Sequence, residues 1–307
     1  MDLPDSLKSL GEQLAAGGAI VPAPELFSAY DVYATETARL FTRPWLAVDH
    51  ASRLAADGDY FRAEAGARSV ILVREDAATI HALRNACLHA GYRVCEEESG
   101  HGDHLFCQYH GWYYALDGRL TDPLLRPELT DRSRFRLPRY AMRIERGLIL
   151  VDLSSAAPEP PPVGAVELGA LPESLADAVV LGRKRYPTDW NWKYLRDFLT
   201  RSRDLLLDDG GYEACVEFGP LSFIVLHGAE AVLARIVPRY PGHSDFELIR
   251  LAAPEMAEGA SAAGDGSRLT EALRRAGEAV AARPLGVLDR SFYEWYWGAM
   301  SEAEGSS

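Results

Sequence analysis

The spacing of hydrophobic residues changes along the chain and divides it into regions. In residues 5–17 and 29–42, hydrophobic residues recur every three or four positions, which predicts two helices. From residue 44 to 153 the pattern becomes short hydrophobic runs, such as Ser69 to Val73, separated by Gly, Asp and Pro. We therefore expect an N-terminal helical arm over residues 1–43, followed by an all-β domain over residues 44–153.

A proline-rich segment, residues 154–164, follows the all-β region and begins with the run SSAAPEPPP. Proline fixes φ and lacks an N–H donor, so we expect a linker here and not a helix or a central strand. In the second domain, residues 165–307, the spacing predicts a long helix that is capped by Thr188 or Asp189 and extends to Leu206. Strands are expected at 213–218, 222–227, 231–238 and 245–252, and further helices at 268–282 and 286–300. This order predicts an α+β chain whose second domain packs a helix on an antiparallel sheet.

The composition is that of a folded chain with room for two hydrophobic cores. Its 307 residues are 48% hydrophobic and 25% charged, which excludes disordered and fibrous classes. The net charge of −13 repels nucleic acids and anionic membranes, so we expect neither as a partner. No segment approaches the 18 apolar residues of a membrane helix, and the first twenty residues carry acids in place of the basic start of a secretion signal. We therefore expect a cytoplasmic protein.

Two Cys-His pairs in the all-β region carry the clearest chemical signal. They are Cys87-x-His89 and Cys107-x2-His110, and the chain has only four cysteines, too few for a disulfide-stapled fold of this size. Two thiolates and two imidazoles suit either a tetrahedral zinc ion or a 2Fe–2S cluster with the thiolates on one iron and the imidazoles on the other. The spacing leaves both open. Zinc modules usually pair cysteine with cysteine and histidine with histidine, so one of each per loop favours the cluster.

The segment NACLHAGYRVCEEESGHGDHLFCQYHGWYYALDGRL resembles the Rieske domain of the non-haem iron ring-hydroxylating oxygenases, including the HGW-Y-DG-L continuation that begins at His110. The resemblance implies a helical arm, then an all-β Rieske domain, then a helix-grip (START/Bet v1-like) domain of the catalytic type. One departure is Ala90, where the family commonly has arginine. The resemblance also implies a Rieske-type 2Fe–2S cluster bound by Cys87, His89, Cys107 and His110.

The resemblance places a mononuclear iron site in the second domain, and there the sequence departs from the family. The run Asn191-Trp192-Lys193 matches the start of the family's catalytic helix. The family's acidic bridging residue and its His-x4-His ligands would then fall near Arg201, Asp204 and Asp209, and no histidine lies between His110 and His227. Without the two imidazoles and one carboxylate of the usual facial triad, mononuclear Fe(II) is doubtful in this chain.

Charges along the same helix indicate an ion-paired face in place of a metal site. One arginine and three aspartates are spaced so that they would lie on one face of a helix, with the arginine between two of the acids. They are Asp197, Arg201, Asp204 and Asp208. Asp289 or Glu294 could stand where the family's third ligand falls, but without partner imidazoles each is expected to be a solvated acid.

Three functions remain open at this point. The first is an oxygenase component that passes electrons through the cluster to the mononuclear iron of a partner subunit, for oxidation of a small organic substrate, aromatic compounds included. For it the resemblance implies a ferredoxin or flavin reductase as electron donor, and a trimer or a mixed hetero-oligomer with a catalytic Rieske oxygenase subunit. The second is a self-contained oxygenase with an unusual mononuclear metal site. The third is a non-catalytic redox or ligand-binding protein. We favour the first.

Overall fold

The structure is a computed structural model that describes residues 3–42, 45–65, 68–124, 126, 131–154, 171–207, 211–257, 271–272, 274–275, 278 and 288–301. The predicted linker from residue 155 on, and most of the helix predicted at 268–282, lie outside these residues. The division of the chain at residues 154–164 therefore stays a prediction.

The N-terminal arm is helical, as its hydrophobic spacing predicts. Leu7 and Leu10 of the first helix are fully buried, and Gly17, with φ 74°, ends that helix in the left-handed conformation that glycine adopts without strain. The elements of the arm are α1 (Asp5–Ala16), α2 (Glu25–Ser28), α3 (Tyr30–Glu36) and the π-helical turn η1 (Thr37–Phe41).

The region after the arm is all-β, as its short hydrophobic runs predict. Its strands form three antiparallel sheets, with the orders β4-β3-β2-β5, β6-β7-β8 and β1-β10-β9. Their bounds are β1 (Leu46–His50), β2 (Asp59–Ala65), β3 (Arg68–Arg74), β4 (Ile80–Arg84), β5 (Ser99–His101), β6 (Leu105–Cys107), β7 (Trp112–Tyr114), β8 (Leu120–Pro123), β9 (Ala141–Glu145) and β10 (Leu148–Asp152), with the 3-10 turn η2 (Ala51–Arg53) after β1.

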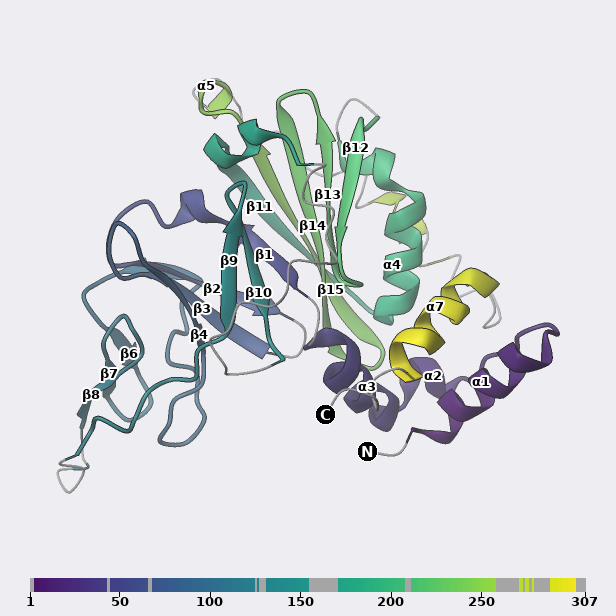
Figure 1. The fold of residues 1–307 in the computed structure, drawn as a ribbon, viewed down its shortest axis with the longest axis horizontal. Helices are drawn as coiled ribbons and strands as arrows, with labels where there is room; N and C mark the ends of the chain where they lie inside the picture. The colour runs from purple at the N-terminus through teal and green to yellow at the C-terminus, as the bar shows by residue number, and fades with distance from the viewer. Residues whose placement is uncertain are drawn as a thin grey trace.

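The second domain is a five-stranded antiparallel sheet with a helix packed on one face (Figure 1). The four predicted strands are present, and a further strand, β11, pairs along nearly its whole length with β15. The sheet order is β11-β15-β14-β13-β12. The bounds are η4 (Glu173–Asp177), β11 (Val179–Thr188), α4 (Trp192–Arg201), η5 (Arg203–Leu206), β12 (Ala214–Phe218), β13 (Ser222–His227), β14 (Glu230–Tyr240), β15 (His243–Ala252), α5 (Pro254–Ala257) and α7 (Arg290–Ser301).

The long helix of the second domain is shorter than predicted at both ends. Asn191, and not Thr188 or Asp189, is the N-cap, and its side chain accepts a hydrogen bond from the Lys193 N–H at 3.0 Å. The helix ends at Arg201, and a separate 3-10 turn brings Leu206 back to the core. Hydrophobic spacing could not detect this break because Leu206 falls at a helical interval after Leu199 and is buried although it lies in the 3-10 turn.

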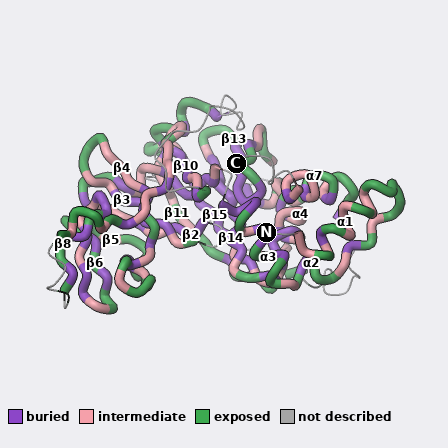
Figure 2. Tube along the Cα trace, turned by 60° about the horizontal axis from the view of Figure 1, so that its bottom comes forward, coloured by how far each residue is buried: buried purple, intermediate pink, exposed green. Residues whose placement is uncertain are grey.

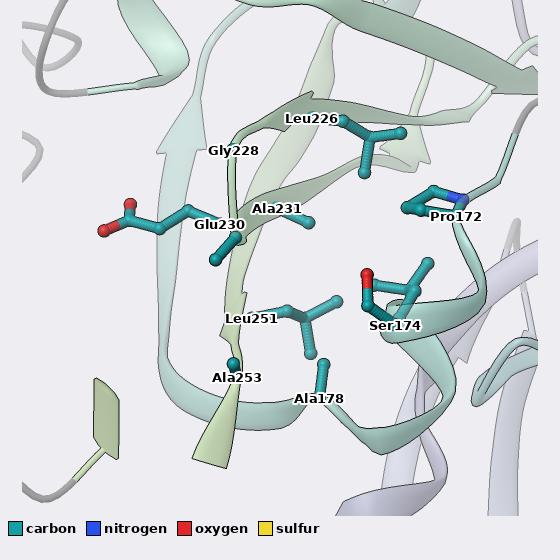
Figure 3. Close-up of a pocket in the computed structure, with 11 residues that line it drawn as sticks. Pro172, Ser174, Ala178, Leu226, Gly228, Glu230, Ala231, Leu251 and Ala253 are labelled. Atoms are coloured by element: carbon teal, nitrogen blue, oxygen red, sulfur yellow. The ribbon is translucent and has the colours of Figure 1, made fainter. Parts of the chain in front are cut away.

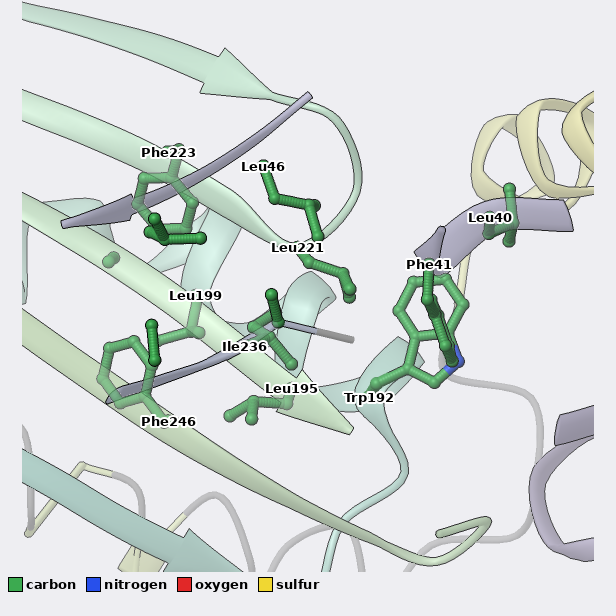
Figure 4. Close-up of a cluster of buried hydrophobic side chains, with 14 of the residues drawn as sticks. Leu40, Phe41, Leu46, Trp192, Leu195, Leu199, Leu221, Phe223, Ile236 and Phe246 are labelled. Atoms are coloured by element: carbon green, nitrogen blue, oxygen red, sulfur yellow. The ribbon is translucent and has the colours of Figure 1, made fainter. Parts of the chain in front are cut away.

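Hydrophobic packing joins the arm, the β-domain and the second sheet. A single buried cluster contains Leu10 of the arm, Ile149 of the β-domain and Leu195 of α4. Figure 4 shows Phe41 of the arm against Trp192, with Leu195 and Leu199 directed at the sheet. Figure 2 shows buried segments running through the central strands, where the β-domain meets the second sheet. The arm therefore shares the core of the second domain and does not form a core of its own.

None of the helices within the described residues has the length and hydrophobicity that crossing a bilayer requires.

Candidate metal centre

Two short loops carry the four residues that the sequence predicts as cluster ligands. The first loop follows β4, and its Gly91 N–H donates to the Cys87 carbonyl at 2.8 Å. The second joins β6 to β7, and its Gly111 N–H donates to the Cys107 carbonyl at 2.9 Å. Gly91 and Gly111 have φ 75° and 70°, values that other residues adopt only with strain. Each loop therefore needs the glycine that follows its histidine.

The loops bring the four side chains together. The ring centroids of His89 and His110 lie 4.3 Å apart, and the Cys87 thiol is close enough to raise the pKa of the Cys107 thiol. Both cysteines are buried and free of disulfides, whereas both histidines are half-buried. The arrangement places two sulfurs inside the domain and two imidazoles nearer the surface.

These side chains fit a Rieske-type cluster. Within the described residues, the buried Nδ1 of His89 has no hydrogen-bond partner, which leaves its lone pair available to a metal. Burial raises the pKa of the Cys107 thiol, although the Tyr109 N–H opposes the rise. Bound iron would displace the thiol proton, since metals bind the thiolate. When bound, the cluster supplies one-electron transfer.

Aromatic rings fix the two imidazoles. The indole of Trp112 stacks on His89 at 4.9 Å with an interplanar angle of 7°. On the other side, Tyr109 contacts the His110 ring edge-on at 4.1 Å and stacks on Tyr92 at 3.7 Å. The histidines thus lie within a row of rings that reaches the surface, where Tyr92 and Tyr109 are each about half exposed.

A buried tyrosine contacts the ligand sulfur. The Tyr114 hydroxyl accepts a hydrogen bond from the Leu88 N–H at 3.0 Å and lies 3.1 Å from Cys87 Sγ. Because burial raises the pKa of Tyr114 far above its ordinary value, the hydroxyl keeps its proton. A thiolate carries no proton, so Tyr114 would be the donor in a hydrogen bond to a Cys87 thiolate.

Asn85 holds the first loop and was missed by sequence reasoning. Its Oδ1 accepts from the N–H groups of Val94 and Cys95 at 2.9 Å each, and its Nδ2 donates to the Cys95 carbonyl at 2.9 Å. Burial raises the pKa of the Cys95 thiol to about 12, which makes it a packing residue. The sequence signal that could have indicated this role is the position of Asn85, two residues before the ligand Cys87.

The polar residues predicted on α4 do not gather as ligands. Arg201 Nε donates to Asp197 Oδ1 at 3.0 Å, so this predicted ion pair is present, and Asp204 is exposed on η5. Because α4 ends at Arg201, the prediction that Asp204 continues the same helix face is wrong. Asp208 and Asp209 lie outside the described residues. Among the residues that the structure does describe, no three His, Cys, Asp or Glu side chains form a set for one metal ion.

The two acids considered on the last helix have local partners. Asp289 accepts from the Phe292 N–H at 2.9 Å and so caps α7, and Glu294 pairs with Arg290 at 2.7 Å. The side chains of the second domain that the structure describes therefore do not form the facial triad of a mononuclear iron.

The start of α4 binds the N-terminal arm. Asn191 Nδ2 donates to the Phe27 carbonyl at 3.0 Å, and Trp192 Nε1 donates to Glu36 Oε2 at 2.9 Å. The fully buried Lys193 Nζ donates to the Leu26 carbonyl at 2.7 Å and pairs with Glu36. The run from Asn191 to Lys193 therefore attaches the start of α4 to the N-terminal arm, and we call it the structural joint.

A small pocket lies elsewhere, between η4 and the β13–β14 turn (Figure 3). Its walls include Pro172, Leu226 and Leu251, and none of the residues predicted for either site lines it.

Comparison with known proteins identifies the β-domain. Residues 44–133 match the family model of the Rieske [2Fe-2S] domain. The benzene 1,2-dioxygenase subunit alpha of Pseudomonas putida is 36% identical over 97 residues, which are 32% of this chain and 22% of that protein. The glycine betaine monooxygenase oxygenase subunit of Chromohalobacter salexigens is 42% identical over 89 residues, 29% of this chain and 20% of that protein. The chain thus spans about a fifth of the length of these curated relatives.

Solved structures share the fold over most or all of the chain. The quaternary ammonium Rieske monooxygenase CntA in complex with L-carnitine has a TM-score of 0.68 at 14% identity, over 90% of this chain and 94% of that one. Naphthalene 1,2-dioxygenase from Rhodococcus sp. bound to indole has a TM-score of 0.65 at 17% identity, over 100% of both chains. The predicted α+β architecture, with its Rieske domain and catalytic-type domain, is confirmed.

Proposed function

We propose that this chain, a Rieske oxygenase alpha-subunit-like protein, is the electron-carrying component of a Rieske-type non-haem iron oxygenase, an oxidoreductase. It would take electrons from a ferredoxin or flavin reductase and pass them to the mononuclear iron of a catalytic partner subunit. The substrate would be a small organic molecule, aromatic compounds included. The assembly would be a trimer or a mixed hetero-oligomer, in which a subunit with one of the two metal centres remains useful.

The observation that carries this proposal is the contrast between two sites in one chain. Cys87, His89, Cys107 and His110 converge in two glycine-closed loops. On α4 the side chains that face the sheet, Leu195 and Leu199, are fully buried hydrophobic residues, and Arg201 is paired with Asp197. The first site suits electron transfer, and in the second the described residues supply no ligand set for oxygen activation.

The surface beside the imidazoles suits contact with another protein. Leu88, Tyr92, Tyr109 and Leu124 are exposed there, and none of them carries a charge. Aromatic residues without charge are typical of the centre of protein interfaces. A partner that covers this surface would exclude water from the row of rings next to His89 and His110.

Metal and sulfide analysis of the purified chain tests the proposal. We expect two irons and two sulfides per chain, an EPR signal of a reduced Rieske centre, and no substrate oxidation by the chain with a reductase alone. Addition of a catalytic Rieske oxygenase subunit should start turnover, and a His110→Ala chain should not support it. A third metal per chain together with turnover by the chain alone would show a self-contained oxygenase. A cluster that no oxygenase subunit can oxidise would favour a non-catalytic redox protein.

A further inference from the structure

One buried carboxylate of the β-domain, that of Glu64, collects donors from separate segments of the chain. Glu64 lies near the end of β2, and its side chain is only 6% exposed. Its Oε1 accepts hydrogen bonds from Arg62 Nη1 at 2.7 Å, from Ser69 Oγ at 3.2 Å and from Arg93 Nη2 at 3.2 Å. Because a buried charge is costly unless it is paired and hydrogen-bonded, these donors hold the carboxylate in one place.

Two of these donors connect Glu64 to the first of the two Cys-His loops. Glu64 and Ser69 are direct cross-strand partners on β2 and β3. Ser69 Oγ accepts from Asn85 Nδ2 at 3.1 Å, and the Asn85 N–H donates to the Ser69 carbonyl at 3.0 Å. The third residue, Arg93, belongs to the loop itself. The carboxylate therefore reaches the loop by two routes, one through Ser69 and Asn85 and one through Arg93.

These two routes hold the ligand turn on both sides. Asn85 precedes the ligand Cys87 by two residues, and Arg93 follows the ligand His89 by four. The Cys87 N–H donates to the Tyr92 carbonyl at 2.6 Å, so the loop closes on itself directly before Arg93. Hydrogen-bond partners behind metal ligands orient those ligands, and their loss weakens metal binding.

The sheet of the second domain holds Glu64 from strand β14. Arg239 Nη1 lies 3.5 Å from Glu64 Oε2. Arg235 is buried, and its Nη2 donates to the Glu64 carbonyl while its Nε donates to the Ala47 carbonyl on β1 at 3.1 Å. The remaining nitrogen, Nη1, pairs with Glu247. A planar guanidinium with all its donors engaged fixes the end of β2 against the second sheet.

The length of the Glu64 side chain is matched to these partners. An aspartate at this position would keep the charge on a side chain about 1.5 Å shorter. Side-chain hydrogen bonds are lost beyond about 3.5 Å, so the shorter side chain could not keep the donors at 3.2 Å together with Arg239 at 3.5 Å. The position therefore requires the reach of glutamate as well as its charge.

We infer that Glu64 is a positioning residue for the metal centre, which ties the loop that carries Cys87 and His89 to the sheet of the second domain. It acts through Asn85 and Arg93. The inference rests on the proposed function in one respect, since it requires the cluster in that loop. It adds that the geometry of the cluster depends on a contact between the two domains.

Glu64→Asp in the cluster-loaded full chain tests the inference. The variant keeps the negative charge among the arginines, so a change in the cluster reports position and not charge. We expect iron release to the chelator ferrozine to be about tenfold faster than in the wild type, as for other groups that orient metal ligands, and the EPR g-values of the reduced cluster to shift. Ser69→Ala, which interrupts the route to Asn85 without altering any charge, should change both quantities in the same direction.

Asp49→Asn is the matched control. Asp49 is also a buried carboxylate of the β-domain, and it lies 3.5 Å from Arg183 of the second sheet. Its hydrogen bonds go to Arg53 and to the next backbone N–H, neither of which belongs to a Cys-His loop. The variant should unfold at a lower urea concentration and keep wild-type g-values and wild-type iron release.

Arg239→Gln tests the contact with the second domain. It leaves the hydrogen bonds of Glu64 Oε1 in place and removes the cation beside Oε2. We expect its g-values to shift in the same direction as those of Glu64→Asp. Wild-type g-values in Arg239→Gln would overturn the dependence on the second domain.

The remaining outcomes separate this inference from the proposed function. Wild-type g-values and iron release in Ser69→Ala and in Glu64→Asp would overturn the inference, and so would equal changes in Asp49→Asn and Glu64→Asp. If Glu64→Asp does not fold, Ser69→Ala decides alone. A wild-type chain with a full cluster that passes electrons to no oxygenase subunit would refute only the proposed function. A wild-type chain that assembles no cluster would refute both.

Discussion

The two Cys-His loops and helix α4 are the two regions that the family resemblance marks as metal sites, and they are built in opposite ways. In the loops, Gly91 and Gly111 permit tight turns, and the polar side chains converge. On α4, Leu195 and Leu199 fill the space against the sheet, and the polar Arg201 turns to its own helix neighbour Asp197. Within the described residues the two regions therefore differ in what their side chains do: those of the loops converge on one another, whereas those of α4 pack on the sheet or pair along the helix.

Removal of a cluster ligand should have the largest effect of all the changes, namely loss of the bound iron and sulfide. If the metal content did not fall, the contrast between the Cys-His loops and α4 would be wrong. Cys87→Ser is expected to abolish the cluster, because a serine hydroxyl replaces one of the two thiolates that a Rieske centre requires. Iron and sulfide per chain are the measurement. The control is Cys95→Ser, a buried cysteine whose backbone is held by Asn85 and which should leave the iron content unchanged. Equal iron loss in both variants would contradict the ligand assignment.

The start of α4 should be a structural joint and not part of a site. Lys193→Met leaves Glu36 buried without its cation and is expected to lower the free energy of unfolding by about 3–5 kcal/mol. Burial lowers the pKa of Lys193, and the Glu36 carboxylate opposes this shift because it favours the charged lysine. Chemical denaturation of the loaded chain measures the loss. The exposed Lys8→Met serves as control, and similar stabilities of the two variants would show that the joint contributes little.

Asp117, in the turn between β7 and β8, should stabilise the β-domain in a pH-dependent way. Burial alone would raise the pKa of Asp117, but the Arg119 N–H and the side chains of Arg119 and Arg136 outweigh it, so the pKa is lowered. A lowered folded-state pKa stabilises the fold above the unfolded value of about 3.9, and this contribution is lost as pH falls through the folded-state value.

Asp117→Asn should therefore cost about 2 kcal/mol at neutral pH, and the cost should shrink below about pH 4. Urea unfolding of the wild type and the variant at several pH values gives this difference. Asp122→Asn, at an exposed position on the adjacent strand, is the control. A cost that does not change with pH would mean that Asp117 acts by shape alone.

The hydrogen bond between Tyr114 and the Cys87 sulfur should affect the reduction potential of the cluster. Tyr114→Phe removes the donor to Cys87 and is expected to lower the reduction potential, because the donor stabilises the more negative reduced state. One hydrogen bond of about 1 kcal/mol corresponds to about 40 mV for one electron. Redox titration followed by EPR measures the shift, and Tyr113→Phe on the same strand is the control. An unchanged potential in Tyr114→Phe would exclude the hydrogen bond in the loaded protein.

The smallest effect is expected at Arg201 on α4, the position that the resemblance aligns with the family's acidic bridging residue. Arg201 is about half exposed, and its pair with Asp197 should contribute less than about 1 kcal/mol. Arg201→Ala should change neither the unfolding free energy beyond that amount nor the metal content. A gain of one divalent ion per chain in this variant would mean that the guanidinium had been blocking an intact metal site.

Sequence alone determined the features that depend on neighbours along the chain. The Cys-x-His and Cys-x2-His spacings, each followed by glycine, specify their loops locally, and the short hydrophobic runs between Gly, Asp and Pro specify the strands. The missing histidines of α4 are likewise a fact of the sequence. These predictions needed no knowledge of distant contacts.

Only the tertiary structure decided which residues from distant segments meet. Asn85 lies close in sequence to Cys95, but its hydrogen bonds depend on the geometry of the loop. Lys193 of α4 pairs with Glu36 of the N-terminal arm. Asp117 pairs with arginines of two different connections, the one between β7 and β8 and the one after β8. Strand β11 depends on its pairing with β15. The end of α4 at Arg201 depends on the return of Leu206 to the core. The reason is physical: local turns are set by backbone conformation within a few residues, whereas buried polar partners and helix ends are selected by packing between elements that the sequence separates widely.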